Sequence, residues 1–341
     1  IPFPTPLPAT SQTSTVHIDN GNHAAILRIK HIPGNAKTIT RPFIVAEGFD
    51  PETIFYPEYP QGGISYNNLI TRLNGAGNDL RDLLRHANNA EYDIIYIDWV
   101  NGVGDIRKNA ETLEKVIAWV NTKKQQAGST NENVLMGQSM GGLVSKYALV
   151  KMEQKGNNHQ VGLFIAHDSP FRGANVTPSS QFMMRHLLGL YASNPLAVTF
   201  GEILVPFIAS FQDVDEDNSD LNGLESYISP LAALTIQDTP AALQMNNYYV
   251  ALNSQPSKFF HNQWQTEFDN IGYPQNSRNV AISNGNMCAL EQGFTAGDFL
   301  LNIKHEDASK AFFKTLLRDF MIGLWGAGSG NLPLAFLSSL P

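Results

Sequence analysis

The chain has 341 residues, of which 43% are hydrophobic and 16% are charged, a composition that fits one large folded domain without long disordered tracts. Its net charge is −8 and no lysine and arginine cluster could follow a phosphate backbone, which argues against nucleic acid as a partner. The single cysteine, Cys288, excludes an internal disulfide and a cysteine-based zinc site.

The N-terminal part of the chain predicts an extended segment followed by a β-hairpin. Residues 1–14 begin with the proline-rich sequence IPFPTPLP and no methionine, which we interpret as an extended segment after a processing boundary. The runs 15–18 and 24–29 favour β-structure, and an Asn-Gly pair lies between them. Because Asn-Gly is a strong hairpin signal, we expect the domain to open with two antiparallel strands.

Buried strands then alternate with helices. Apolar runs of strand length occur at 42–48, 92–99, 133–137 and 161–168. Apolar side chains at helical spacing predict helices over 79–87, from Asp105 as N-cap to Gly128 as stop, and over 140–154. This alternation predicts an α/β fold with a mostly parallel, doubly wound sheet covered by helices on both faces.

The alternation stops over residues 176–260, which are apolar and helix-compatible without an intervening strand. We expect this segment to be a helical cap or lid inserted into a core formed by residues 15–175 and 261–325. Strands at 278–283 and 299–303 and a closing helix over 306–321 would complete that core. Residues 326–341 would form a tail that looks truncated.

Residues 187–211 are the stretch that raises the question of a membrane span. Pro195, Glu202 and Pro206 interrupt it, so two short amphipathic helices are expected there instead. The sequence therefore predicts no membrane span and leaves interfacial contact with a membrane open.

Gly137-Gln138-Ser139-Met140-Gly141 matches the pattern G-x-S-x-G between a predicted strand and a predicted helix. In that context the serine lies on a strained turn with its hydroxyl exposed, and the glycines let the backbone turn without clashes. The Met140 backbone N–H, at a helix N-terminus, could stabilise a developing oxyanion by ~2.7–4 kcal/mol. The pattern predicts Ser139 as a nucleophile; a glycine-rich turn without catalytic meaning is the alternative.

Three passages resemble the α/β-hydrolase superfamily, in particular its lipase and esterase branch. NVLMGQSMGGLVSKYAL (133–149) is similar to the GHSMGG-type turns of lipases. PFIVAEGFDP (42–51) resembles the strand and His-Gly pair that supplies the second oxyanion donor, with Glu47 in place of the histidine. VGLFIAHDSPFRGAN (161–175) is similar to a Ser/Thr-Pro-x-x-Gly segment of lipases and of GPI-inositol deacylases.

The resemblance spans residues 15–321 and also extends to a group of exported bacterial hydrolases with EGFDP and GQSMGG motifs. It implies an α/β-hydrolase fold and, with the missing initiator methionine, an extracellular or periplasmic location. It further implies Phe49, through its backbone N–H, as the second member of the oxyanion hole beside Met140, with Gly48 as runner-up. A tight turn capped by Asp50 without catalytic meaning is the alternative for this motif.

The acid of a catalytic triad should lie between Ser139 and the catalytic histidine, since the order in this fold is Ser, Asp or Glu, then His. Asp168 is the first choice because it ends a predicted buried strand, and some lipases, which the chain resembles, carry the acid there. A role as cap of the following turn is the alternative for Asp168. Asp269 and Asp298 are held in reserve.

The histidine expected to act as base is His305, because it follows the strand predicted at 299–303 and precedes the closing helix. Its neighbours Lys304 and Glu306 would equally suit an ordinary solvated helix start. His261 is the alternative, and a histidine beyond residue 341 is another.

Together these features predict a serine hydrolase that cleaves carboxylic esters, small or lipid-like, through an acyl-enzyme without a metal or organic cofactor. The apolar cap would suit an acyl-chain pocket or a lid. An acyltransferase or peptidase on the same fold, and a non-catalytic binding module that retains it, are the alternatives.

Overall fold

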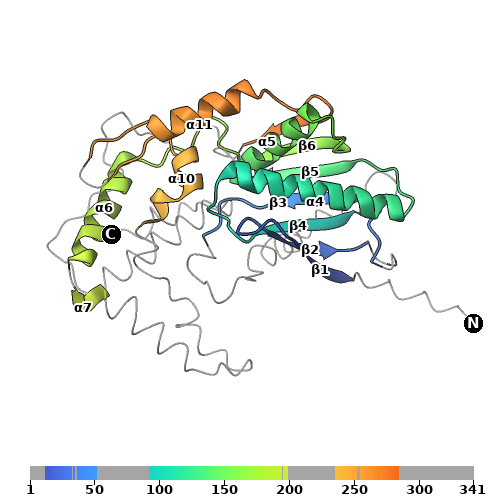
Figure 1. The fold of residues 1–341 in the computed structure, drawn as a ribbon, viewed down its shortest axis with the longest axis horizontal. Coiled ribbons are helices and arrows are strands. Elements are labelled where there is room, and N and C mark those ends of the chain that lie inside the picture. The colour runs from blue at the N-terminus through green and yellow to red at the C-terminus, as the bar shows by residue number, and fades with distance from the viewer. Residues whose placement is uncertain are drawn as a thin grey trace, which may run out of the picture.

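The computed structural model describes residues 12–51, 92–198 and 235–283, apart from positions 33, 35, 36, 194, 252 and 253. Within these residues the chain forms a seven-stranded sheet with the strand order β1-β2-β4-β3-β5-β6-β7 (Figure 1). The strands are β1 (Thr13–Ile18), β2 (Ala25–Lys30), β3 (Pro42–Ala46), β4 (Asp93–Trp99), β5 (Asn133–Gln138), β6 (Val161–His167) and β7 (Arg278–Ile282).

The pairing of the strands confirms the predicted fold class. β1 pairs antiparallel with β2, and β2 pairs antiparallel with β4. All neighbours from β4 through β3, β5 and β6 to β7 are parallel. A hairpin followed by a parallel sheet in this order is the α/β-hydrolase arrangement expected from the sequence.

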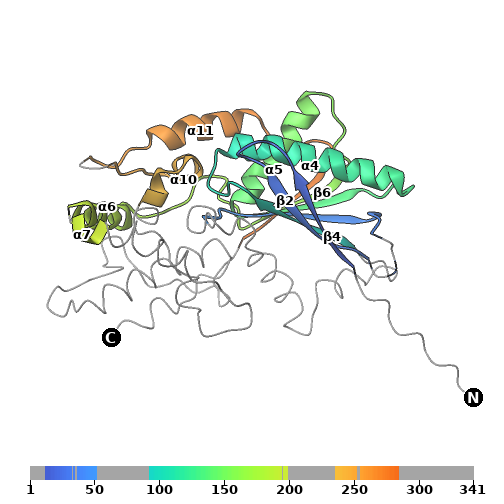
Figure 2. The same cartoon turned by 60° about the horizontal axis from the view of Figure 1, so that its bottom comes forward.

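Two long helices pack on one face of this sheet, α4 (Ile106–Gln126) and α5 (Met140–Gln154) (Figure 2). The Asp105 side chain accepts a hydrogen bond from the Arg107 backbone N–H at 2.8 Å, as the predicted N-cap of α4. The helix ends at Gln126, and Gly128 follows with a positive φ of 70°, which fits its predicted role as stop signal. The helices predicted over 79–87 and 306–321 lie outside the described residues.

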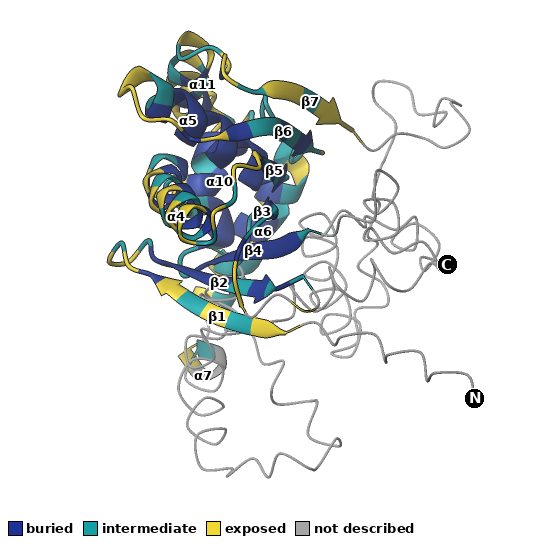
Figure 3. Cartoon of the chain, turned by 90° about the vertical axis from the view of Figure 1, so that its right-hand side faces the viewer, coloured by how far each residue is buried: buried dark blue, intermediate teal, exposed yellow. Residues whose placement is uncertain are grey.

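The hydrophobic core lies between the sheet and these two helices. Every residue of the central strands β3 and β4 is buried, whereas the edge strand β1 is largely exposed (Figure 3). The side chains predicted to face the core from the two helices are all buried: Ile106, Ala110, Leu113, Ile117 and Val120 from α4, and Leu143, Val144, Tyr147 and Val150 from α5. The burial pattern explains why apolar periodicity located these elements correctly.

The segment predicted as a cap contains α6 (Pro178–Ala192), α7 (Pro195–Val198), a 3₁₀ turn η3 (Ile236–Asp238) and α10 (Pro240–Met245), with α11 (Phe259–Asn270) beginning at its end. These helices extend beyond the carboxyl ends of the parallel strands, toward the left of Figure 1. Backbone hydrogen bonds tie α10 to the turns after β4 and β6: Ala241 donates to Val103 and Ala174 donates to Met245. The boundaries 176 and 260 of a separate cap remain a prediction.

The helix α11 is held against α4 and α5 by polar contacts. Glu267 receives hydrogen bonds from Arg107 at 2.7 Å and from the Tyr147 hydroxyl at 2.6 Å. Lys146 donates to the Phe268 carbonyl at 2.8 Å. In the described part of the chain, no helix is both long and apolar enough to traverse a bilayer.

Candidate active site

Ser139 lies on the turn that joins β5 directly to α5. Its backbone has φ 48° and ψ −119°, a conformation that is uncommon for a residue with a side chain and costs about 1–3 kcal/mol. The Ser139 N–H donates to the His167 carbonyl at 2.9 Å, and the Ser139 carbonyl accepts from Gly142 at 3.0 Å. The neighbouring strand β6 and the first turn of α5 therefore hold the strained conformation in place.

The Ser139 hydroxyl is not used to cap the helix that it precedes. Serine at a helix N-cap ordinarily accepts a hydrogen bond from a backbone N–H of the first turn. Here the side chain makes no such bond, and the residue is partly exposed. The strained turn therefore leaves the Ser139 hydroxyl without a hydrogen bond to the first turn of α5.

Three glycines make this turn sterically feasible. A Cβ added to Gly137 would lie 2.5 Å from the Gly141 carbonyl carbon. A Cβ added to Gly141 would lie 2.5 Å from the Glu47 carbonyl oxygen and closer still to that of Ala46. Because real Cβ atoms do not approach this closely, the turn requires glycine at these positions and brings α5 onto the end of β3. Gly142 meets the Ser169 side chain in the same way.

The two predicted oxyanion donors belong to the two elements that meet at Gly141. Met140 is the first residue of α5, where a backbone N–H has no acceptor within the helix. Phe49 lies on the turn after β3, and in the part of the chain that the structure describes its backbone N–H has no acceptor. This turn is held on its other side by Asp50, which donates its backbone N–H to the Gly102 carbonyl at 3.1 Å.

Asp168 follows β6 as Ser139 follows β5. Gln138 pairs with His167 in the parallel register, so Ser139 and Asp168 are the next residues on adjacent strands. Asp168 is exposed, has a positive φ of 48°, and donates its backbone N–H to Ile282 of β7 at 2.7 Å. The sheet places the predicted acid at the same edge as the predicted nucleophile.

The histidine of the predicted triad is not located. His305 and the reserve acid Asp298 lie outside the described residues. His261, the alternative base, is buried in α11 with Nδ1 3.0 Å from the Gln244 carbonyl oxygen. A carbonyl can only accept, so Nδ1 carries the proton and Nε2 is the basic nitrogen. Within the described ranges, no histidine ring is hydrogen-bonded to the Ser139 hydroxyl.

The reserve acid Asp269 is engaged on the surface. Its carboxylate accepts from Arg172 at 3.1 Å and from Gln265 at 2.9 Å, and both members of the ion pair are substantially exposed. Nothing in this arrangement connects Asp269 with Ser139.

A group of three buried acids lies close to the Ser139 turn, and the sequence alone did not predict that these acids come together. Carboxylate oxygens of Glu47, Asp50 and Asp98 lie within 4.8 Å of one another, and all three residues are buried. Burial and the two neighbouring carboxylates raise the pKa of Glu47 well above its ordinary value. Burial raises the pKa of Asp98 to about 7, although the Arg28 guanidinium opposes the shift. The feature of the sequence that could have indicated this group is the presence of acids inside or directly after apolar strands.

Hydrogen bonds connect these acids to donors on the neighbouring strands. The Tyr96 hydroxyl donates to Glu47 Oε1 at 2.7 Å, and the Trp99 backbone N–H donates to Glu47 Oε2 at 3.2 Å. Arg28 donates to Asp98 at 3.2 Å. Three carboxylates suit a hard cation in principle, but here oxygens of two of them face hydrogen-bond donors. The geometry therefore fits a hydrogen-bonded acid network better than a metal centre.

No protein-family model and no curated protein matches the chain. Among solved structures, it is similar to one of two fungal esterases from Rhizomucor miehei, with 10% identity, a TM-score of 0.39 and coverage of 80% of this chain and 74% of the other. An esterase from Pyrobaculum calidifontis matches with 12% identity, a TM-score of 0.35 and coverage of 80% and 75%.

A thermostable esterase from Pseudomonas putida matches with 13% identity, a TM-score of 0.33 and coverage of 49% of this chain. The chain spans less than half the length of this esterase and of esterase Est22, 45% and 47% respectively. Likenesses this partial do not assign an activity to the chain.

Proposed function

We propose that the chain is a serine hydrolase that cleaves carboxylic esters through an acyl-enzyme on Ser139. The observation that carries the proposal is the strained Ser139 at the β5–α5 junction, whose hydroxyl does not cap the helix. A conformation that costs free energy persists only where the surrounding structure enforces it, and such residues concentrate at functional sites. In the α/β-hydrolase fold this position is the nucleophile elbow.

In the proposed reaction the Ser139 Oγ attacks the ester carbonyl carbon while a histidine takes the hydroxyl proton. The negative charge on the former carbonyl oxygen is stabilised by the backbone N–H groups of Met140 and Phe49. The C–O bond to the alcohol then breaks, and the histidine returns the proton to the leaving alcohol. Water attacks the acyl-enzyme in the same manner, which releases the carboxylic acid and restores the serine.

The other members of the proposed triad are Asp168 and His305. Asp168 is supported by its place beside Ser139 at the carboxyl edge of the sheet. An acid there can orient the histidine through its Nδ1–H and stabilise the imidazolium that forms. His261 is the alternative base, supported by the tautomer that leaves Nε2 free of a proton.

The test compares Ser139→Ala with Ser145→Ala on p-nitrophenyl acetate, butyrate and decanoate. Ser145 is a buried serine of α5, the helix that Ser139 precedes, and its hydroxyl has no hydrogen-bond partner, so it serves as a matched control. We expect Ser139→Ala to lose about 10⁴-fold or more in kcat and Ser145→Ala to keep its activity. A folded Ser139→Ala protein with wild-type turnover would refute the proposal. The chain-length series separates short esters from lipid-like ones.

A further inference from the structure

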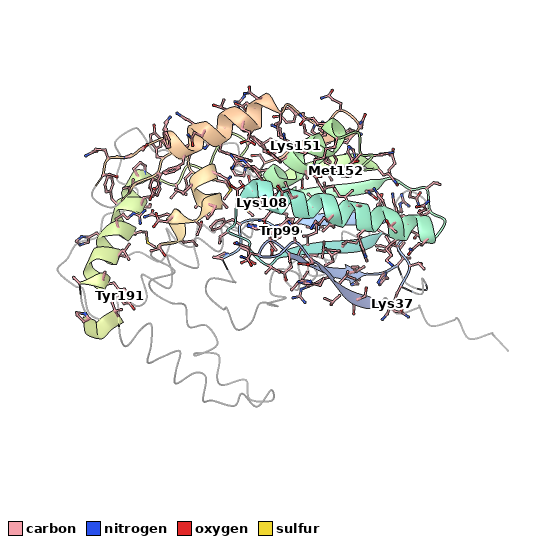
Figure 4. The ribbon with its side chains drawn as sticks, viewed as in Figure 1. Lys37, Trp99, Lys108, Lys151, Met152 and Tyr191 are labelled. Carbon is pink, nitrogen blue, oxygen red and sulfur yellow. The ribbon has the colours of Figure 1, made fainter. Side chains whose placement is uncertain are left out.

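The turn after β3, residues 47–50, carries Phe49, the second oxyanion donor of the proposed function, and neighbouring elements hold it from two sides. On one side α5 packs onto it, since a Cβ on Gly141 would lie 2.5 Å from the Glu47 carbonyl oxygen. On the other side Trp99, which ends β4 and is labelled in Figure 4, donates its indole N–H to the same carbonyl at 3.0 Å. The backbone of Glu47 is therefore fixed between the nucleophile turn and β4.

The Glu47 side chain strengthens the contact with β4. It is only 4% exposed, and its two oxygens accept from the Tyr96 hydroxyl at 2.7 Å and from the Trp99 backbone N–H at 3.2 Å. The parallel register pairs Ala46 with Ile97, so these contacts extend the ladder of β3 and β4 by one further residue. Three hydrogen bonds thus determine the path of the chain from Glu47 toward Phe49.

Among the residues that the structure describes, the charged and titratable groups that face this carboxyl come from its own turn and from the neighbouring strands. Asp50 belongs to the turn, Tyr96 and Asp98 to β4, and Arg28 of β2 reaches the group through its ion pair with Asp98. Burial and the neighbouring carboxylates of Asp50 and Asp98 favour the protonated form of Glu47 and raise its pKa. Burial and the Glu47 carboxylate also raise the pKa of Tyr96.

We propose that Glu47 is a positioning residue for the ester hydrolysis proposed above, because its hydrogen bonds to Tyr96 and Trp99 hold the turn so that the Phe49 N–H faces the oxyanion over Ser139. Glu47 itself touches no reacting atom in this account. A charge on Glu47 beside Asp50 and Asp98 adds repulsion within the buried group and loosens the turn. The rate of acylation is then expected to fall as the pH rises through the raised pKa of Glu47, while substrate affinity changes little.

The experiment measures kcat and KM for p-nitrophenyl butyrate from pH 5 to 10 in the wild type, Glu47→Gln and Glu47→Ala. Glu47→Ala is expected to lower kcat about 10- to 100-fold, approaching the effect of deleting one oxyanion donor, with KM within about 2-fold. Glu47→Gln keeps a neutral side chain of the same shape, whose amide oxygen can accept from the Trp99 N–H while its NH2 group donates to the Tyr96 hydroxyl oxygen, so it should recover most of kcat. Its rate should also lack the decline that ionisation of Glu47 causes in the wild type.

Asp93→Asn is the matched control, because Asp93 is a buried acid at the amino end of β4, away from the carboxyl end that Glu47 contacts. Its carboxylate accepts hydrogen bonds from the backbone N–H groups of Ile32, Thr40 and Arg41. It should lower the melting temperature and leave kcat and the pH profile unchanged. Should Glu47→Ala fail to fold, Tyr96→Phe removes only the hydroxyl donor and is expected to lower kcat about 3- to 10-fold at constant KM.

The outcomes separate the two proposals. A folded Glu47→Ala or Tyr96→Phe protein with wild-type kcat would overturn the positioning role alone, as would an equal loss of kcat in Asp93→Asn. A Glu47→Gln protein whose rate still declines with rising pH as the wild type does would overturn it as well. Absence of ester turnover in the wild type would instead overturn the proposed function, and the positioning role with it.

Discussion

The two ends of the central strand β4 both carry buried acids, and the structure treats them differently. At the amino end, Asp93 is fully buried and accepts hydrogen bonds from three backbone N–H groups. At the carboxyl end, carboxylate oxygens of Asp98, Glu47 and Asp50 lie within 4.8 Å of one another, so three acids crowd one buried space. At the amino end, hydrogen-bond donors surround the acid and fix it in place. At the carboxyl end, Glu47 and Asp98 have raised pKa values and lie near the strained turn of Ser139. Such a concentration of unfavourable features is expected where a protein performs chemistry.

The largest effect is expected for Gly141→Ala, which crowds the turn after β3 beside the carboxyl end of β4. The added methyl group would lie 2.5 Å from the Glu47 carbonyl oxygen, so α5 or the turn after β3 must move. We expect ester hydrolysis to fall about 100-fold or more and the free energy of unfolding to drop by about 1–3 kcal/mol. Steady-state kinetics and urea unfolding measure both.

Gly189→Ala supplies the control for that substitution. Gly189 is a helical residue of α6, and a Cβ there meets nothing within 4 Å. It should raise stability by about 0.5–1 kcal/mol and leave activity unchanged. Equal behaviour of the two variants would contradict the close approach of α5 to β3.

At the amino end, Asp93→Asn tests whether the buried acid is purely structural. An amide offers one acceptor oxygen in place of two, so backbone N–H groups of Ile32, Thr40 or Arg41 lose their partner. We expect a loss of about 1–3 kcal/mol in unfolding free energy, measured by urea denaturation at pH 7. A variant as stable as the wild type would show that the N–H groups find other acceptors.

The pH dependence of the free energy of unfolding reports on Asp98, at the carboxyl end of β4. The pKa of Asp98 is about 7 in the folded chain, above its ordinary value, so the folded state binds more protons than the unfolded state between about pH 4 and 7. Stability from this group is therefore lost as the pH rises through that range, at up to ~1.4 kcal/mol per pH unit for one proton. Asp98→Asn should flatten the slope of unfolding free energy against pH. An unchanged slope would contradict the raised pKa.

The smallest expected effect concerns Ser145 in the middle of α5. Its hydroxyl is buried without a hydrogen-bond partner, which costs free energy relative to an apolar side chain. Ser145→Ala should therefore stabilise the chain by roughly 1 kcal/mol, a change that calorimetry detects as a higher Tm. A lower Tm would mean that the hydroxyl is satisfied in solution.

Local patterns were sufficient for most of the described fold. The Asn-Gly hairpin, the buried strands β3 to β6 and the capped helix α4 each depend on residues close together in the chain, and each was predicted within a few residues. The strand-to-helix turn at Ser139 is equally local, since the glycines that permit it lie within three positions of the serine.

The parts of the site that depend on long-range contacts could not be derived in the same way. Glu47 and Asp98 are about 50 positions apart and meet only because β3 and β4 pair in parallel register. The choice between His305 and His261 depends on which ring reaches Ser139 across more than 100 positions. Periodicity carries no information about such a distance, and His305 lies outside the described residues.

The central claim is that Ser139 is an activated nucleophile, and its covalent reaction with a fluorophosphonate probe tests this most directly. Tandem mass spectrometry of the digested wild-type protein should locate the adduct on Ser139, and folded Ser139→Ala should remain unlabelled. Folded wild-type protein without an adduct, or with an adduct on another residue only, would contradict the account.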